Sequence, residues 1–347
     1  MTGSDARVHL TCAEARELAL GALRGVGYCD DDAGLIAAHV LDAALCGYEY
    51  SGLAKILNVA QFMSQYPVQG PMRLRQETSV SALYDGANHN GMVAVDRATD
   101  VAIAKAKAHG FGVVGVNRTW MSGRSAYFVE RNASAGLIGI HTVGSRPLVA
   151  PPGAAAAAIG TNPIAFGFPT PDAPLVIDMG FAALMFTDLR LRARRGEVLP
   201  EGCAIDAQGQ PTQDPVAALA GAVLCFGGYK GFGLALAMQA LAVLAGAADD
   251  PDGAGYLVLA IKPDLLVPLE HYRRGLGALL ERIKATPRQP GVDEIRIPSE
   301  RSVRTRTRLQ REGVQIDALV YEALRQLAQQ APGVRLSSSI VPAKSTS

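Results

Sequence analysis

The sequence predicts a mixed α/β fold, and two observations carry that prediction. Short stretches rich in β-branched residues, such as FGVVGV and YLVLAI, alternate with long alanine-rich stretches of helical periodicity. Strands and helices mix along the whole chain, but only a minority of the connections have the order of a clean βαβ unit. The 347 residues can bury a large core and suggest two or three lobes.

Residues 1–78 predict a helical N-terminal lobe. Thr11 followed by Glu14 makes a capping box ahead of an apolar periodic run, which predicts a helix over about residues 12–25. A second helix, AGLIAAHVLDAAL, follows the acidic cluster Asp30–Asp32, and acidic residues favour a helix N-terminus. The segment GYEYSGLAKI completes this lobe.

Residues 79–262 predict a central domain that begins with the strand SVSALYDG and the helix MVAVDRATDVAIAKAKAH. The next residues, GFGVVG at 110–115, match the dinucleotide-binding fingerprint, and Glu130 follows about twenty positions on, as that motif expects. In the fingerprint the glycines follow a strand and open a helix. Here they close a helix at Gly110 and enter a strand, so we interpret the match as a coincidence.

The remaining elements follow from the same patterns. We expect strands at 137–143, 174–179 and 256–261 and helices at 123–135, 180–195 and 231–246. Residues 263–335 predict a C-terminal helical part that packs on the N-terminal lobe, with helices near 268–285 and 315–330. Residues 336–347 predict a disordered tail.

Composition excludes several classes of function. With 49% hydrophobic residues, 19% charged residues and a net charge of +1, the chain gives no reason to expect nucleic acid or an anionic membrane as a partner. Five dispersed cysteines form neither a disulfide framework nor a metal-type cluster, so we expect a reducing cytoplasm and no metal. The N-terminus has no signal-peptide layout, and no apolar run reaches the ~18 residues of a membrane span.

Four features are candidates for chemistry. In GTNP, Thr161 could hydrogen-bond a carboxylate, and in GGYKG, Lys230 follows a flexible loop and precedes a helix, as a phosphate or carboxamide site requires. From the residues alone, an ordinary strand-entry turn is the favoured interpretation of GTNP, and a tight turn with a solvated lysine explains GGYKG as well as a binding site does. Asp178 ends an apolar strand and could be a helix cap. Asp188 lies in a segment expected to be an apolar helix, where a carboxylate needs a partner, so it is a candidate to orient an acid.

The motifs GTNPIA, IDM and GGYKG, in that order, resemble the type 2 malate/L-lactate dehydrogenase family over roughly residues 10–330. The family includes sulfolactate and ureidoglycolate dehydrogenases and Δ1-piperideine- and pyrroline-2-carboxylate reductases. The resemblance implies a fold unlike the Rossmann fold, in which a mainly antiparallel sheet wrapped by helices binds NADPH or NADH beside a helical substrate lobe. It also implies a homodimer that transfers hydride between the nicotinamide and the carbon next to a carboxylate.

The resemblance implies roles for residues at matching positions. Lys55, where the family usually has arginine, and Thr161 would hold the substrate carboxylate. Arg124 is a candidate for the 2′-phosphate of NADPH. The residues expected to line the cofactor are Met121, Ser122, Gly123, Arg124, Asp178, Met179, Gly180, Tyr229, Lys230, Ser299 and Arg301.

This chain departs from its family at both usual histidines. The family motif S-H-G reads YSG here, so Ser51 replaces the proton-donating histidine, and N-S-x-H-F-G reads NRTWMS, so Trp120 replaces the other. We expect Trp120 to form a large apolar wall of the substrate pocket. Among the remaining histidines, His89 is a weak candidate for a role, and a surface turn is the favoured interpretation.

The loss of both histidines favours an imine substrate, because a Schiff base can bind already protonated, whereas a carbonyl needs a proton donor. Tyr50, paired with Asp188 or Lys55, is the possible donor. Three hypotheses remain: an NAD(P)H-dependent cyclic-imine reductase, a 2-hydroxy-acid dehydrogenase with Tyr50 as acid, and a catalytically silent nucleotide-binding protein.

Overall fold

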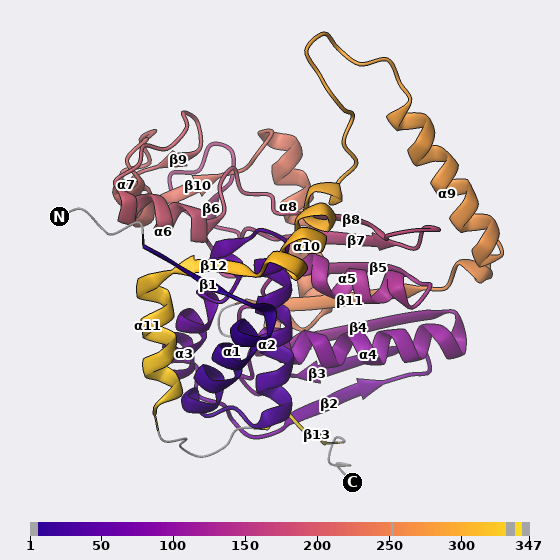
Figure 1. Ribbon diagram of the computed structural model, residues 1–347, viewed down its shortest axis with the longest axis horizontal. Helices are drawn as coiled ribbons and strands as arrows, with labels where there is room; N and C mark the ends of the chain where they lie inside the picture. The colour runs from indigo at the N-terminus through magenta and orange to yellow at the C-terminus, as the bar shows by residue number, and fades with distance from the viewer. Residues whose placement is uncertain (1–5, 251–252, 331–336, 342–347) are drawn as a thin grey trace.

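The computed structural model describes residues 6–250, 253–330 and 337–341 and has the predicted mixed α/β fold (Figure 1). Its centre is an eight-stranded sheet that is antiparallel except at the β13–β2 and β3–β4 pairs. In spatial order the strands are β13 (Ile340–Val341), β2 (Met72–Glu77), β3 (Ser81–Asp85), β4 (Phe111–Asn117), β11 (Gly255–Ile261), β5 (Ile138–Gly144), β7 (Ile164–Phe168) and β8 (Leu175–Met179). Because β2 belongs to this sheet, the sheet begins ahead of the boundary that the sequence suggested at residue 79.

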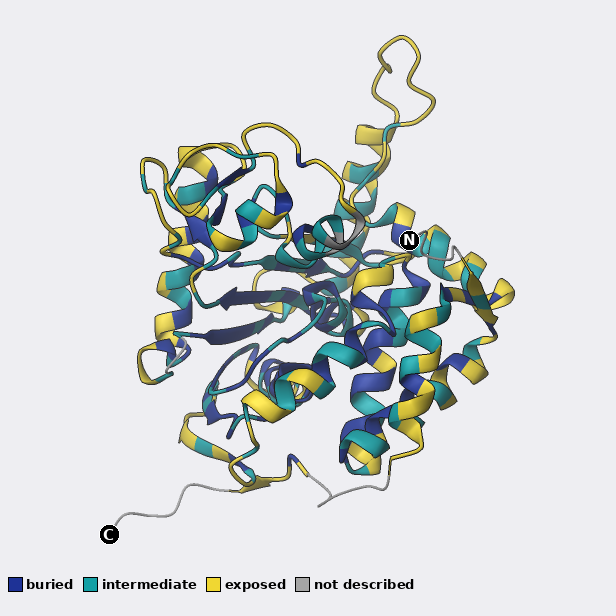
Figure 2. Ribbon diagram, turned by 90° about the vertical axis from the view of Figure 1, so that its left-hand side faces the viewer, coloured by how far each residue is buried: buried dark blue, intermediate teal, exposed yellow. Residues whose placement is uncertain are grey.

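Helices cover both faces of the sheet. On one face lie α4 (Gly91–His109) and α5 (Ser125–Ser134), and on the other lies α8 (Tyr229–Leu244). Strand glycines permit the close approach on each face: a Cβ at Gly112 would lie 2.3 Å from a backbone oxygen of α4, and one at Gly144 would lie 2.3 Å from a side chain of α8. Figure 2 shows the covered strands as mostly buried.

The glycine-rich segment at 110–115 is not a nucleotide-binding turn. Gly110 caps the C-terminus of α4 in the left-handed conformation (φ 86°), and β4 begins at the next residue. The order helix, glycines, strand is therefore confirmed, and it is the reverse of the order in the dinucleotide fingerprint. Glu130, the apparent acidic partner in that motif, instead forms a two-pronged ion pair with Arg306.

The N-terminal lobe contains α1 (Cys12–Val26), α2 (Asp30–Leu45), the 3₁₀ turn η1 (Glu49–Ser51) and α3 (Lys55–Gln65). The predicted capping box of Thr11 and Glu14 is present at the start of α1. Distant parts of the chain join here, because β1 (Arg7–Leu10) pairs with β12 (Val314–Asp317) and α11 (Ala318–Ala328) packs on α1.

A second, smaller unit lies beside the end of the main sheet. It consists of the three-stranded sheet β6 (Val149–Ala150), β10 (Ala222–Leu224) and β9 (Ala204–Ile205) with α6 (Phe186–Arg195) and α7 (Pro215–Ala220), whereas the turn η2 (Ala247–Asp249) follows α8. The helix expected over 180–195 therefore starts only at Phe186, and its sequence FTDLRLRARR is basic rather than apolar.

Between β11 and α10 (Glu300–Glu312), the chain forms η3 (Pro263–Leu265), α9 (Leu269–Lys284) and a long loop that project from the body (Figures 1 and 2). No residue of α9 is buried within this single chain. The sequence did not predict α10, whose N-terminus reaches the site described below.

The predicted disordered tail is wrong for residues 337–341. The side chain of Ser338 is buried, and both its N–H and its hydroxyl donate to Asp32, at 2.8 and 2.6 Å. Arg97 pairs with the same carboxylate at 2.8 Å, and β13 then adds to the edge strand β2. A buried carboxylate needs such partners, so Asp32 orders this segment. Residue 336 and residues 342–347 lie outside the described part.

Candidate active site

A cavity of about 660 Å³ lies where the N-terminal lobe meets the edge strand β8 and the start of α10. It brings together most of the site residues predicted from the sequence, namely Tyr50, Ser51, Lys55, Met121, Gly123, Arg124, Thr161, Asp178, Met179, Gly180 and Ser299. The predicted residues that do not line it are Trp120, Ser122, Asp188, Tyr229, Lys230 and Arg301. Lining residues that the sequence missed include Tyr48, Ser125, Met185, Phe186, Thr187 and Ser302.

Lys55, the first residue of α3, is a cation in the wall of this cavity whose charge no described residue balances. Its side chain is 8% exposed, and none of the described residues forms a hydrogen bond or an ion pair with its ammonium. Burial alone lowers its pKa from 10.5 to about 8, with no carboxylate opposing that effect. Buried charges in proteins are normally paired, so an unpaired one in a cavity indicates an anionic ligand.

Tyr50 and Ser51 lie beside it in the single turn η1. Tyr50 is 38% exposed, and its ring meets the ring of Tyr48 edge to face at 6.3 Å. Burial in the cavity wall raises the pKa of Tyr50, and Tyr48, Asp178 and Asp188 raise it further. The phenol is therefore protonated at neutral pH but is a weaker acid than a free tyrosine. The Ser51 side chain is buried.

Asp178, at the end of β8, caps a helix that comes from another part of the chain. Its Oδ2 accepts a hydrogen bond from the backbone N–H of Ala126, in the first turn of α5, at 2.8 Å. Burial raises the pKa of Asp178, while the Ala126 N–H and the Arg124 guanidinium oppose the increase. The carboxylate thus fixes the start of α5 against the cavity wall.

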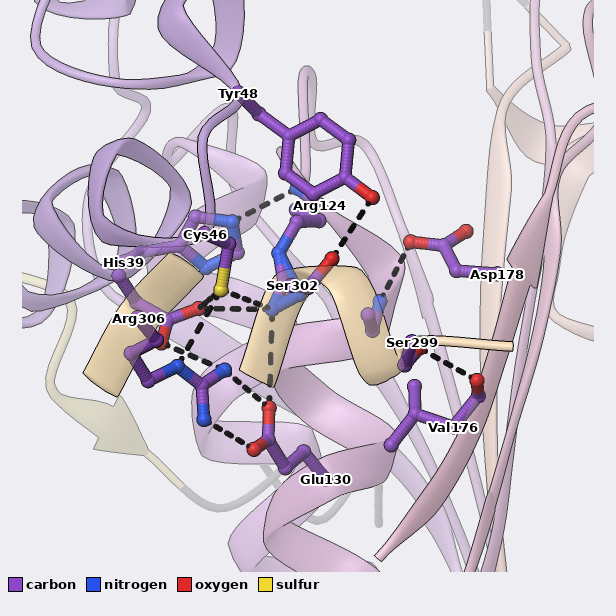
Figure 3. A network of polar contacts seen from close by, with 12 residues as sticks. His39, Cys46, Tyr48, Arg124, Glu130, Val176, Asp178, Ser299, Ser302 and Arg306 are labelled. Atoms are coloured by element: carbon purple, nitrogen blue, oxygen red, sulfur yellow. Dashed lines mark hydrogen bonds and ion pairs between the residues drawn. The ribbon is translucent and has the colours of Figure 1, made fainter. Parts of the chain in front are cut away.

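Arg124 belongs to a charge-balanced cluster behind the cavity (Figure 3). Its guanidinium lies 3.0 Å from Asp42 and 3.7 Å from Glu130. Arg306, from α10, pairs with the same two carboxylates. Two guanidinium groups therefore face two carboxylates, and Cys46 Sγ lies within 3.4 Å of both. The charge of Arg124 is already compensated, which argues against the predicted contact with a 2′-phosphate.

His39 fixes the loop that carries Arg124. The Arg124 backbone N–H donates to His39 Nε2 at 2.8 Å, and burial holds the pKa of His39 well below its usual range, so the ring is neutral. Gly123 has φ 80°, and a Cβ there would lie 2.3 Å from Nε2, so only glycine fits. The sequence offered one signal for this histidine, its position among the apolar residues of α2.

Trp120 does not reach the cavity. Its ring stacks on Phe62 and Tyr66, with centroids 5.8 and 6.4 Å away, and its Nε1 donates to the Asn88 carbonyl at 3.0 Å. It belongs to the core of the N-terminal lobe. The position of Trp120 therefore contradicts the expectation that it walls the substrate pocket. His89, the weak candidate, is buried and bonds the Gly70 carbonyl at 2.9 Å.

Asp188 is also placed differently from the expectation. It lies in the first turn of α6, and its Oδ2 accepts from Arg192 Nε at 3.0 Å, one helical turn away. Its hydrogen-bond partner is thus on its own helix, although its charge also raises the pKa of Tyr50. The sequence reasoning failed because it treated a basic, half-exposed helix as an apolar one.

The C-terminal contribution comes from the first turn of α10. Ser299 caps this helix in the left-handed conformation (φ 71°) and its hydroxyl donates to the Val176 carbonyl at 2.6 Å. Tyr48 OH and Ser302 Oγ are 3.2 Å apart (Figure 3). Arg301 lies beyond the cavity lining, with its guanidinium 5.5 Å from the centre of the Tyr48 ring.

Two predicted residues lie at the start of α8, away from the cavity. Tyr229 is 74% exposed, and Lys230 follows it in the first turn. No group of three or more metal-binding side chains occurs among the described residues. Likewise, no helix in the described ranges is long and apolar enough to cross a membrane.

Comparisons with known proteins agree with this architecture. The profile of the malate/L-lactate dehydrogenase family matches residues 10–325. A malate/(S)-sulfolactate dehydrogenase of Methanothermus fervidus is 30% identical, over 91% of this chain and 96% of its own. A Δ1-pyrroline-2-carboxylate reductase of Burkholderia ambifaria is 32% identical, over 93% and 98%. The solved sulfolactate dehydrogenase of Methanocaldococcus jannaschii superposes with a TM-score of 0.84 at 30% identity, covering 94% of this chain and 98% of that one.

The family profile matches most of the chain, and this chain covers at least 96% of the length of each of the three relatives named above. The names of these relatives describe two reactions, the dehydrogenation of hydroxy acids and the reduction of imine carboxylates. The protein is therefore an oxidoreductase that uses a nicotinamide cofactor, and it belongs to the malate/L-lactate dehydrogenase family.

Proposed function

We propose that this protein reduces the C=N bond of a cyclic imine carboxylate, or the C=O bond of a related 2-oxo acid, with NADPH or NADH. The observation that carries the proposal is the buried, unpaired ammonium of Lys55 in the cavity. A substrate carboxylate there would supply the missing counter-charge, and charge-assisted hydrogen bonds are the stronger ones. The Thr161 hydroxyl, also in the lining, would add a neutral donor to the same carboxylate.

An imine is the better match for the groups in this cavity. No histidine lies among the described lining residues, and burial raises the pKa of Tyr50, which makes it a weaker acid than a free tyrosine. A protonated imine needs no proton donor at the moment of hydride transfer, whereas a carbonyl does. The relative named as a pyrroline-2-carboxylate reductase supports this substrate class, and the malate/sulfolactate relative supports a 2-oxo acid as the alternative, with Tyr50 as one possible acid.

The lining fits a nicotinamide, which supplies the hydride when it is bound. Met121, Met179 and Phe186 offer apolar walls, and Asp178 offers a carboxylate acceptor for a carboxamide. Gly180 leaves the wall open, because a Cβ there would fill the space 3.1 Å from Met185 Sδ. Lys55 and Thr161 would hold the substrate carboxylate and so orient the substrate beside the nicotinamide.

We propose NADPH as the preferred cofactor, with Arg301 meeting a cofactor phosphate. The Arg301 guanidinium has no carboxylate partner among the described residues and rests on the Tyr48 ring, whereas Arg124 is already paired. Replacing Arg301 with alanine should raise KM for NADPH at least tenfold and leave KM for NADH within about threefold, which initial-rate kinetics would measure. An equal rise for both cofactors would argue against a 2′-phosphate contact.

We also propose a homodimer. The projecting helix α9 exposes Leu279 and Ile283, and the turn before it exposes Leu266 to 92%. Exposed apolar residues on a helix that buries nothing favour a protein partner, and a second copy would cover them. Light scattering should give twice the mass of one chain, and Leu279→Asp with Ile283→Asp should reduce it to one. The five free cysteines support the cytoplasm as its location.

The test is a substrate panel followed at the nicotinamide absorbance band. The panel contains two cyclic imines, pyrroline-2-carboxylate and piperideine-2-carboxylate, and several 2-oxo acids, namely pyruvate, oxaloacetate and larger aryl 2-oxo acids. Each substrate is tested with NADPH and with NADH. We expect turnover of the cyclic imines, and we expect Lys55→Met to raise KM for them at least 100-fold. Binding of the nucleotide without turnover of any carboxylate in the panel would contradict the proposal and favour a silent nucleotide-binding protein.

A further inference from the structure

A 2-oxo acid poses a problem that an imine does not, because its oxygen must receive a proton as hydride arrives. The cavity offers few groups for this task. The Tyr48 hydroxyl is engaged with Ser302 at 3.2 Å, and Asp188 is paired with Arg192 outside the lining. Ser51 and Thr161 carry alcohols, which are not acids at neutral pH. The two remaining candidates are Tyr50 and Lys55.

Lys55 has the geometry of a donor rather than of a structural cation. Its side chain is buried, it lines the cavity, and its ammonium has three N–H donors that no described residue accepts. An ammonium that binds a carboxylate with one donor keeps two others. In a 2-oxo acid the reacting oxygen is attached to the carbon next to the carboxylate, so one ammonium can reach both.

We propose that Lys55 both anchors the substrate carboxylate and donates the proton when the substrate is a 2-oxo acid. This inference rests on the proposed function and deepens it, since it names the acid that replaces the missing imidazole. It assigns Tyr50 to the edge of the site, in agreement with its 38% exposure. Imine substrates would use the first of the two roles alone.

The step balances without any further reactant. Carbon 2 of the 2-oxo acid accepts a hydride from NAD(P)H, and the π electron pair of its C=O bond moves to oxygen. One Nζ–H bond of Lys55 breaks as the new O–H bond forms, which leaves a 2-hydroxy acid and a neutral amine. Water that enters the cavity returns the proton to Nζ, so each turnover consumes one proton.

The charged and titratable groups around Lys55 are consistent with this role. The pKa of Lys55 is lowered to about 8 by burial, so the group is mostly protonated at neutral pH and yields its proton more readily than an exposed lysine. His39 of α2 is neutral, and Tyr50 of η1 has a raised pKa. Arg124 is compensated by its carboxylates, and Asp178 of β8 is bound to the start of α5.

The experiment separates the two roles with Lys55→Arg. Arginine keeps a positive charge and a carboxylate-binding fork but does not release its proton in this pH range. We measure kcat and KM of the wild type and the variant for one cyclic imine and one 2-oxo acid between pH 6 and 10. Calorimetry with oxamate, which carries a carboxylate beside an amide carbonyl and accepts no hydride, reports carboxylate binding without turnover.

Because Lys55 also holds the carboxylate of either substrate, we expect Lys55→Arg to weaken oxamate binding and imine reduction to a similar and modest extent, at most about tenfold. Its kcat for the 2-oxo acid should fall at least ~100-fold, the usual contribution of a general acid. The fall of wild-type 2-oxo-acid kcat/KM above about pH 8 should be absent in the variant.

Three outcomes would overturn the inference: a variant that keeps its 2-oxo-acid kcat, a variant that loses imine and 2-oxo-acid turnover equally, or a wild type that reduces imines alone. The first would assign the proton to Tyr50, and Tyr50→Phe would then show the 100-fold loss. Failure of the proposed function is distinguishable, because the wild type would then turn over neither class of substrate.

Discussion

Replacing Lys55 with methionine should stabilise the folded protein at neutral pH. The pKa of Lys55 is about 8 in the folded state and 10.5 for a lysine exposed to water, as in the unfolded chain. This difference corresponds to about 3 kcal/mol at ~1.36 kcal/mol per pKa unit. Below pH 8 the ammonium is charged in both the folded and the unfolded chain, so the folded state carries the whole penalty of burying it. Between pH 8 and 10.5 the folded chain releases the proton first, and the penalty fades.

The predicted gain from Lys55→Met is therefore about 3 kcal/mol at pH 7 and much smaller at pH 10.5, which urea unfolding at the two pH values would measure. Lys105→Met is the matched control. Its side chain is similarly covered (11% exposed), but its ammonium pairs with Glu77 at 2.9 Å, so its replacement should give no gain. A Lys55→Met protein that is no more stable than the wild type at pH 7 would refute the claim that Lys55 is an unpaired buried charge.

Three other measurements address the rest of the structure. Ser338→Ala should lower the free energy of unfolding by about 2 kcal/mol, because the buried Asp32 carboxylate loses a hydrogen bond; an unchanged urea midpoint would argue against an ordered tail. Glu130→Gln should lower it by about 2 kcal/mol, since Arg306 loses a charged partner; a urea midpoint equal to that of the wild type would show that this ion pair does not stabilise the fold. Oxamate binding at pH 9 should take up a proton, because a bound carboxylate raises the pKa of Lys55, while binding at pH 6.5 should take up none; calorimetry in buffers of different ionisation enthalpy measures this.

Local signals were sufficient for much of the fold. The capping box at Thr11 and the left-handed glycine at Gly110 mark helix ends with chemistry that lies within a few residues. The helix α10 could not be found in this way, because ERSVRTRTRLQRE has little apolar periodicity. Its ion pair with Glu130, 176 positions earlier in the chain, contributes to holding it, and a single sequence does not reveal such a contact.

The candidate site shows the same division. Lys55, Thr161 and Asp178 follow motifs, and the structure brings all three to one cavity, although their roles in catalysis stay predictions. Trp120 and Asp188 were misplaced because their orientation depends on tertiary packing. The indole found aromatic neighbours in the lobe core, and the carboxylate found an arginine one turn along a helix that begins later than expected.

The charge distribution around the cavity gives a physical reason for a ligand carboxylate. Behind the wall, Arg124 and Arg306 are matched by Asp42 and Glu130, so that cluster is neutral and holds the loop and α10 in place without attracting an anion. Lys55 adds one positive charge that no described residue balances. Because buried charge destabilises a fold unless it is compensated, such a residue is tolerated where a ligand completes the pair. A substrate carboxylate would restore neutrality, and the positive charge would then lie where negative charge develops on the reacting oxygen.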